Sequence, residues 1–426
     1  MGEIVKVENK SIYYEKKQVE KELYKRKMIP EVKANRRFIF ILVFIFLFLS
    51  VLNLYSVSDY QEKFSLKSMI IFMIIGSIMG FFISAIDYKI LRKKWIHRSI
   101  YWGSLILLAV MFVFGRVIKT DIIKETNGAY GWIRIGGIGI QPSEILKLAF
   151  IILISLILES GENKKEDIKD TLKRTLKVSL PFFCLIFSQN DLGTVIHYVS
   201  IYIILIFFTK IKTSTIVKIV SALGSLGLIA ITLMYKFGNG DYRVKRVIMW
   251  IDGLLHDGYV GNIDIGYQVA QSLLAFGNGG IFGVGYGNGV QKFSYLPEIH
   301  TDFIMALLGE ELGFCGLVIV LILFFLLYYN LLKISRISKD YLGKYLAVGV
   351  AGMIITQVLI NLFVTVGLLP VFGIPMPFFS YGGTSILTIL MALGLVLSVN
   401  NYTVLEFDKT QNKLYNYFIR RGGKKK

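Results

Sequence analysis

The feature that most constrains the fold of this chain is a series of ten apolar runs separated by polar stretches. Hydrophobic residues make up 54% of the chain, and a run of about 20 apolar residues is long enough to cross a bilayer as a helix. The pattern predicts an all-α polytopic membrane protein with ten transmembrane helices. The predicted spans are Phe38–Val57, Met69–Ile86, Ile100–Ile118, Ser143–Leu158, Val178–Ser188, Thr194–Thr209, Thr213–Tyr235, Phe303–Leu332, Tyr345–Val366 and Thr384–Val399.

The distribution of basic residues predicts how these spans are oriented. The two tails and alternate loops carry roughly 35 Lys and Arg, whereas the other loops carry roughly 10, and cytoplasmic loops are the basic ones. Both termini are therefore expected in the cytoplasm, with basic tails at 1–37 and 400–426 around a membrane domain at 38–399. Residues 236–302 form a large predicted extracytoplasmic loop between the seventh and eighth helices. The net charge of +19 is not interpreted as nucleic-acid binding, because no basic patch is interleaved with aromatic residues on a soluble domain.

The stretch YLPEIHTDFIMALLGEE, residues 295–311, places polar side chains directly before an apolar run. Pro297 ends any preceding helix, and Glu298, His300, Thr301 and Asp302 follow it. A carboxylate at a helix N-terminus meets free N–H groups and stays ionised. Two interpretations are open: Thr301 or Asp302 caps the helix, or Asp302 performs chemistry at the outer mouth of the membrane domain.

Two further polar stretches are predicted on the same side of the membrane. In GAYGWIRIGGIGIQPSEILK, residues 128–147, Trp132 suits the interface, and Glu144 and Lys147 share one helix face. They form either a structural ion pair or part of a polar site, since charges inside a span commonly mark one. In QNDLGT, Asp191 could cap the next helix. His197 is interpreted as a packing residue, because no His, Cys and carboxylate cluster has metal-ligand spacing.

The long loop and the last outer loop supply further candidates. Arg243 and Arg246 are cations on the side that carries few others, so they could hold a phosphate or contact lipid headgroups. Gln271 follows in the same loop. The glycine-rich run at 277–289 does not follow a βαβ strand, so a dinucleotide site is not predicted. Ser380 lies in a Pro/Gly-rich loop, which must be buried or line a cavity if it lies near the membrane.

Five of these motifs, in this order, closely resemble those of the SEDS family (shape, elongation, division and sporulation; the FtsW/RodA/SpoVE proteins). The motifs are QPSEILKLA, QNDLGT, YQVAQSLLAFGNGGIFGVG, LPEIHTDFIMALLGEELG and LLPVFGIPMPFFSYGGTS. The resemblance runs from about Phe38 to Val399 and is slightly closer to FtsW than to RodA. Asn190 stands where the family usually has proline, and Phe372 where it usually has threonine.

The resemblance implies a peptidoglycan glycosyltransferase that polymerises lipid II at the outer face of the bacterial cytoplasmic membrane. It implies that Asp302 is the essential aspartate, and that Trp132 and Glu144 are functional. Asp302 is thus the expected catalytic residue of an inverting transfer. The residues expected to bind substrate are Trp132, Arg134, Glu144, Lys147, Asp191, Arg243, Arg246, Gln271, Glu298, His300, Thr301 and Ser380.

The implied partners are a class B penicillin-binding protein, which is a transpeptidase, and other divisome or elongasome membrane proteins. A divalent cation, Mg²⁺ or Mn²⁺, is an open alternative as a helper for the departing pyrophosphate. The rival functions are a lipid II flippase and a catalytically silent scaffold. A flippase should have polar residues along a path near the bilayer midplane, whereas here most of them gather at the predicted outer mouth.

Overall fold

A computed structural model shows a bundle of long helices. It describes residues 30–58, 65–123, 125–126, 128–135, 138–218, 220–221, 224–225, 227, 232, 242–255, 264–293 and 295–422. Six of the described helices are long and apolar enough to cross a membrane, and α6 is a shorter apolar helix. The six are Pro30–Tyr55, α2 (Leu66–Ala85), Lys94–Val117, α10 (Ile304–Ile337), α11 (Tyr341–Thr365) and the first part of α12, Gly383–Glu406. The chain is therefore a multi-pass membrane protein built almost entirely of α-helices.

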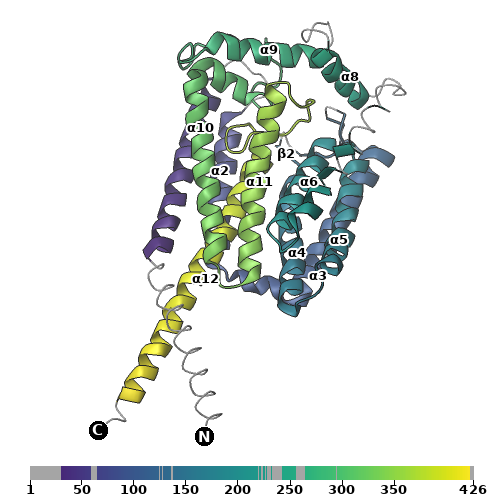
Figure 1. The fold of residues 1–426 in the computed structure, drawn as a ribbon. Coiled ribbons are helices and arrows are strands. Elements are labelled where there is room, and N and C mark those ends of the chain that lie inside the picture. The colour runs from purple at the N-terminus through teal and green to yellow at the C-terminus, as the bar shows by residue number, and fades with distance from the viewer. Residues whose placement is uncertain are drawn as a thin grey trace.

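The remaining elements complete the bundle and cover one end of it. They are η1 (Tyr88–Arg92), α3 (Lys94–Phe112), the π-helical turn η2 (Val113–Val117), β1 (Ile133–Ile135), β2 (Ile138–Ile140), α4 (Pro142–Lys164), α5 (Ile168–Ser188), α6 (Leu192–Phe207), α8 (Tyr242–Leu255) and α9 (Asp264–Gly279). Figure 1 shows α8 and α9 lying across the end of the bundle where β2 also lies. We refer to this as the α9 end, and to the end where α10 finishes and α11 begins as the opposite end.

Helices α11 and α12 form the centre of the bundle. Within the apolar window of each, 72% and 83% of the residues are buried, against 22% to 33% for the other four spans. Close helix contact depends on small residues: a Cβ on Gly80 of α2 would lie 2.5 Å from the Leu390 carbonyl oxygen of α12. Glycine therefore permits the backbones to approach where a larger side chain would separate them.

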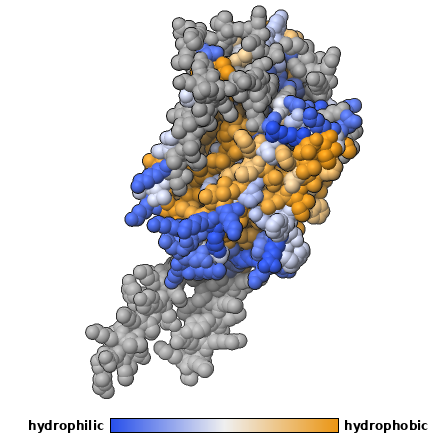
Figure 2. Space-filling view, turned by 90° about the vertical axis from the view of Figure 1, so that its right-hand side faces the viewer, coloured by the Kyte–Doolittle hydropathy of each residue, from blue (hydrophilic) through white to orange (hydrophobic). Residues whose placement is uncertain are grey.

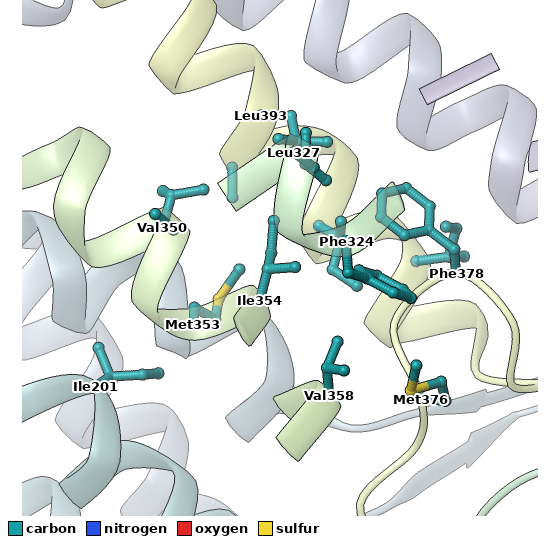
Figure 3. Close-up of a cluster of buried hydrophobic side chains, with 14 of the residues drawn as sticks. Ile201, Phe324, Leu327, Val350, Met353, Ile354, Val358, Met376, Phe378 and Leu393 are labelled. Carbon is teal, nitrogen blue, oxygen red and sulfur yellow. The ribbon is translucent and has the colours of Figure 1, made fainter. Parts of the chain in front are cut away.

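The core continues from the central helices into the loop at 366–382. Side chains of α6, α10, α11 and α12 meet there with Met376 and Phe378 of the loop (Figure 3). The ring of Phe46 stacks on Phe378 at a centroid distance of 4.8 Å and lies 4.5 Å from Phe324. This apolar packing fixes an irregular loop beside the candidate site, as non-helical backbone near a membrane requires.

Several helix starts in the structure, those of α4, α6 and α11, follow ordinary capping chemistry. Asp191 is the N-cap of α6 and accepts from the Thr194 N–H at 3.0 Å, and Asp340 caps α11 through Gly343. Pro142 occupies the first position of α4, where its missing N–H costs nothing. The capping interpretation of Asp191 is thus confirmed.

Several predicted boundaries were wrong, and each error has a physical reason. Helix α5 begins at Ile168, ten residues before the predicted start, because Asp167 caps it and its basic first turns remain exposed. Helix α12 continues to Gly422 through the basic tail. The long loop at 236–302 contains α8 and α9. The predicted span Thr213–Tyr235 lies largely outside the described residues.

Helix α10 is broken near its start, at Gly313, where φ is 66°. The loop after α9 fills the break: Phe314 N–H donates to the Gly280 carbonyl at 2.9 Å, and Val284 N–H donates to the Glu310 carbonyl at 2.9 Å. Backbone groups released by a helix break inside a membrane protein need such substitutes. The break holds the loop at 280–293 against the first turns of α10.

Candidate active site

The candidate site lies at the α9 end, on the turn that leads into α10. The carbonyl oxygen of Glu298, a residue with φ of 56°, accepts from the backbone N–H groups of Thr301 and Asp302, each at 3.1 Å. The N-cap of α10 is Phe303, and no side chain caps it. The prediction that Thr301 or Asp302 caps this helix is therefore wrong: the Thr301 hydroxyl donates instead to the Glu298 carboxylate at 2.8 Å.

Two neighbouring segments fix the backbone of this turn. The Asn361 side chain of α11 donates to the Asp302 carbonyl and to the Ile374 carbonyl, both at 2.8 Å. The Ser380 hydroxyl donates to the Thr301 carbonyl and accepts from the Met376 N–H. The turn and the loop at 366–382 are thus held together, and the Asp302 side chain has a defined position.

Asp302 itself is half-buried and faces a gap left by a glycine. A Cβ on Gly373, whose φ is 73°, would lie 3.5 Å from Oδ2 of Asp302. Among the described residues, no basic side chain forms an ion pair with Asp302, and no donor forms a hydrogen bond with its carboxylate. The loop backbone therefore leaves one side of the carboxylate free of a side chain.

The electrostatics of the site suit a proton acceptor. Burial, followed by the charge of Glu298, raises the pKa of Asp302 from its ordinary 3.8 to about 7, while the guanidinium of Arg246 lowers it. Arg246 is anchored because its Nη1 donates to the Val371 carbonyl at 2.9 Å. A carboxylate with a pKa near the working pH is an effective general base. The structure thus brings together the predicted residues Asp302, Glu298, Thr301, Arg246 and Ser380.

A second polar group surrounds the starts of α4 and α6. Glu144 and Lys147 form a buried ion pair of 2.5 Å, with exposed fractions of 5% and 1%. Asp191 accepts from the Gln141 side-chain amide at 2.8 Å, and Gln141 N–H donates to the Thr384 hydroxyl. The structural ion-pair interpretation of Glu144 and Lys147 agrees with this geometry, and a role in substrate binding stays a prediction.

The two polar groups meet through the loop at 366–382. A Cβ on Gly193, in the first turn of α6, would lie 2.4 Å from the Phe372 carbonyl. Phe372 directly precedes Gly373, which borders Asp302. The N-terminus of α6 and the Asp302 turn therefore contact the same short piece of backbone from different sides.

The other predicted residues are spread around this end. Trp132 is half-buried against Gly139, and Arg134 is exposed on β1. Gln271 is half-buried on α9. His300 is buried, with its ring 6.0 Å from that of Tyr381. The Arg243 side chain lies outside the described part of the structure.

The prediction of His197 as a packing residue agrees with its place on α6, since its buried ring contacts the Met353 carbonyl at 2.9 Å. In the described part of the chain, no group of three His, Cys, Asp or Glu is arranged to hold a metal ion.

Two residues that support the candidate site or its surroundings were missed from the sequence. Asn361 positions the Asp302 backbone, and the signal for it was an amide inside an apolar span, four residues after Gln357. Lys292 is 1% exposed and pairs with Glu311 at 2.9 Å. No local sequence signal shows that this loop lysine meets a carboxylate of α10, because the contact forms only when the loop folds back onto the helix.

This fold and site define a multi-pass membrane protein with a half-buried aspartate, unpaired among the described residues, at one end of its helical bundle. Residues 35–404 match the profile of the FtsW/RodA/SpoVE family, described as cell cycle proteins. The chain belongs to this family, the SEDS proteins, which confirms the resemblance seen in the motifs.

Named relatives extend over most of the chain. The stage V sporulation protein E of Bacillus subtilis (strain 168) is 35% identical over 370 residues, which cover 85% of this chain and 96% of that protein. A probable peptidoglycan glycosyltransferase FtsW of Geobacter sp. (strain M18) is 33% identical, covering 79% of this chain and 87% of that protein.

Solved structures share the fold. A chain of a peptidoglycan synthase complex, described as coordinating polymerization and crosslinking, superposes with a TM-score of 0.68 at 26% identity and covers 86% of this chain and 97% of its own. The Thermus thermophilus rod shape determining protein RodA gives a TM-score of 0.59 at 26% identity, covering 85% of this chain and 95% of its own.

Proposed function

We propose that this protein polymerises lipid II into β-1,4 glycan strands at the outer face of the bacterial cytoplasmic membrane, for division or elongation. The observation that carries the proposal is Asp302, a half-buried carboxylate without an ion pair among the described residues and with a pKa raised to about 7. Similarity to a probable peptidoglycan glycosyltransferase supports the reaction class.

The proposed topology has ten spans, with both termini in the cytoplasm and the α9 end outside. The six long apolar helices and the shorter α6 supply part of this set. The bias of Lys and Arg toward alternate loops supports the orientation. Polymerisation outside the membrane then requires the reacting groups at the α9 end, where Asp302 lies.

The proposed reaction is a single displacement with inversion. Asp302 takes the proton from the 4-hydroxyl of the acceptor sugar. The oxygen of that hydroxyl attacks the anomeric carbon of the donor at the same time. The new C–O bond forms while the bond from that carbon to the lipid pyrophosphate breaks, and the pyrophosphate leaves with the electron pair. The α-linked donor gives a β-linked product in one step, so a single carboxylate base is sufficient.

The leaving pyrophosphate requires cationic partners. Arg246 is the described cation whose charge lowers the pKa of Asp302. A guanidinium is matched to phosphate oxygens. Arg243 lies one turn earlier on α8 and is proposed as a second contact. Lys147 would take this role only after separating from Glu144, so Arg246 is the stronger candidate.

Glu298 is the acidic side chain beside Asp302 that could help to hold a divalent cation, while Asp302 would have to stay free of the metal to act as the base. The cation would supply charge stabilisation to the leaving group. The base and anion-binding roles assigned to Asp302 and Arg246 do not depend on it.

The proposed partner is a class B penicillin-binding protein, a transpeptidase that would crosslink the emerging strand. The fold similarity to a chain of a peptidoglycan synthase complex supports this assignment. The rival flippase function would need mobile polar groups along a path through the bilayer, whereas the buried charges Lys147 and Lys292 are already held by Glu144 and Glu311.

The deciding experiment is glycan synthesis from labelled lipid II by the purified protein, with no other glycosyltransferase present. Asp302→Asn should lose roughly 10²-fold or more in turnover, which is the usual contribution of positioned proton transfer. Binding of lipid II should persist, because only the step that removes the proton is affected. Asp302→Glu should also be impaired, since the carboxylate is displaced by about one methylene.

Full activity of Asp302→Asn would exclude the base role. Translocation of lipid II without any glycan product would favour the flippase instead.

A further inference from the structure

A second site lies at the opposite end of the bundle, far from Asp302. A cavity of about 580 Å³ opens between α3, α4 and α5. Its lining comes from the end of η1, the first turns of α3, the second half of α4 and the early part of α5. None of its residues belongs to the candidate active site.

The cavity lies at the level where a membrane headgroup layer would be. Trp95 and Trp102 of α3 are 67% and 60% exposed, and exposed tryptophans gather at membrane interfaces. His97 and Arg98, which line the cavity, lie between them on α3. Figure 2 shows a hydrophobic belt on this side of the molecule, bordered toward the opposite end by a hydrophilic edge.

The charge of the lining is strongly positive. Four basic residues line the cavity, Arg92, Arg98, Lys164 and Arg174, against one acid, Glu159. Arg92 already neutralises that acid, since its guanidinium donates to both carboxylate oxygens of Glu159 at 2.5 to 3.2 Å. Glu166, which lies outside the lining, pairs with Arg174 and more distantly with Lys164. Four basic residues against these two acids still leave an excess of positive charge, which favours an anion in the cavity.

Two side-chain nitrogens in the lining lack hydrogen-bond partners among the described residues. Nδ1 of His97 and Nε of Arg174 are buried from solvent without a hydrogen bond. Arg174 is anchored through another atom, because its Nη2 donates to Glu166 at 2.5 Å. Arg98 forms no ion pair within the described part of the chain. Buried donors are almost always paired in proteins, so these atoms indicate an acceptor-rich ligand.

The depth of the lining residues shows what kind of anion fits. On α4, the apolar lining residues Leu153, Leu156 and Ile157 precede the polar ones from Glu159 to Lys164. The cavity is therefore charged at the helix ends and apolar toward the membrane interior, where Val178 of α5 adds to the wall. A free phosphate would use only the charged half, whereas a phospholipid would use both.

We propose that this cavity binds an anionic membrane phospholipid, with its phosphate on Arg98, Arg174 and His97 and its acyl chains along α4. Basic pockets between helices at a membrane face are suited to such headgroups. An anionic lipid is favoured over a zwitterionic one, because the only lining carboxylate that could hold an ammonium group is engaged by Arg92. This proposal does not depend on the glycosyltransferase function.

The test is native mass spectrometry of the full chain in detergent, titrated with phosphatidylglycerol and separately with phosphatidylcholine. Arg98→Gln and Arg174→Gln should each weaken phosphatidylglycerol binding by about fivefold, the usual effect of one basic residue at an anionic membrane. Phosphatidylcholine binding should be weaker in the wild type and unaffected by either change.

Lys94→Gln and Lys173→Gln are matched controls. Each removes one positive charge close to Arg98 or Arg174, and neither residue lines the cavity. Loss of binding in the controls as large as in Arg98→Gln would overturn the site in favour of general surface charge. Equal affinity for the two lipids, or competition by inorganic phosphate at the same concentration as the lipid, would overturn the choice of ligand.

Folding is checked in the same samples by monodispersity and by thermal unfolding, which these changes should leave unaltered. Removing Arg174 leaves Glu166 with only the 3.8 Å contact to Lys164 among the described residues, and that variant could fail to fold. The exposed Arg98 has no such partner in the described structure, so Arg98→Gln decides the outcome in that case.

Discussion

The carboxylates around the first turns of α10 fall into two kinds. Glu311 is buried and fully engaged: Lys292 donates to it at 2.9 Å and Ser56 at 2.7 Å. Asp302, nine positions earlier, has no ion pair or hydrogen bond to its carboxylate among the described residues, and its pKa is raised to about 7. The same short segment thus carries one acid that holds the fold together and one that is kept available.

This difference indicates how a membrane protein can separate stability from chemistry. A buried charge is tolerated when it is paired, and removing one partner is strongly destabilising. A carboxylate with no partner costs stability but can accept a proton near neutral pH. The pairing around Glu311 fastens the loop at 280–293 to α10 and so supports the turn on which Asp302 lies.

The largest expected effect comes from removing the lysine that pairs with Glu311. Lys292→Met should lower the free energy of unfolding by about 3–5 kcal/mol, because it leaves Glu311 buried and uncompensated. The measurement is thermal unfolding and monodispersity of detergent-purified protein. The double change Lys292→Met with Glu311→Gln should recover much of the loss, since the buried charge is then absent. A stable Lys292→Met protein would contradict the structural role of the pair.

An intermediate effect is expected from the residue that positions Asp302. Asn361→Ala removes two side-chain hydrogen bonds, to the carbonyls of Asp302 and Ile374. Misplacement of a catalytic group lowers turnover, and a loss of about tenfold is expected. The change should reduce kcat more than it raises KM, because Asn361 contacts the backbone of the turn rather than substrate. A rise in KM alone would instead place Asn361 in substrate binding.

The smallest effect is expected at Asp191, which also lies at the α9 end. Its carboxylate caps α6 and accepts from Gln141 and Thr194. Asn caps a helix about as well as Asp, so Asp191→Asn should retain activity within about twofold of wild type. Glycan assays of Asp191→Asn and Asp302→Asn, run side by side, compare the same chemical change in two settings. A loss at Asp191 as large as at Asp302 would mean that its charge, too, contacts substrate.

The sequence alone was sufficient for the family, the membrane class and the neighbourhood of the site. Apolar runs and ordered motifs are local signals, and they placed Asp302, Glu298 and Ser380 in the correct segments. The capping interpretation of Asp302 failed because Glu298 adopts a positive φ, which tightens the turn and moves the helix start to Ile304. Such backbone choices depend on tertiary contacts.

Contacts between residues that lie far apart in the chain also could not be predicted from the sequence. Helices α8 and α9 were predicted as loop, since each is too short to span a membrane and both lie between predicted spans. Asn361 bonds to Asp302, 59 positions away, and Lys292 bonds to Glu311, 19 positions away. The roles of both residues follow from these partners. Pairings of this kind are set by how the loops fold back onto the bundle.

The most direct test of the central claim is the pH dependence of kcat/KM for glycan synthesis between about pH 5 and pH 8, which reports the ionisation of the free enzyme's base. A raised carboxyl pKa means that Asp302 is protonated, and unable to act as a base, below about pH 7. Activity of the wild type should therefore fall on the acid side with an apparent pKa of about 7. Glu298→Gln removes a charge that raises this pKa, so its acid limb should move to lower pH. A wild-type profile that is flat across this range, or an acid limb that Glu298→Gln leaves in place, would contradict Asp302 as the base.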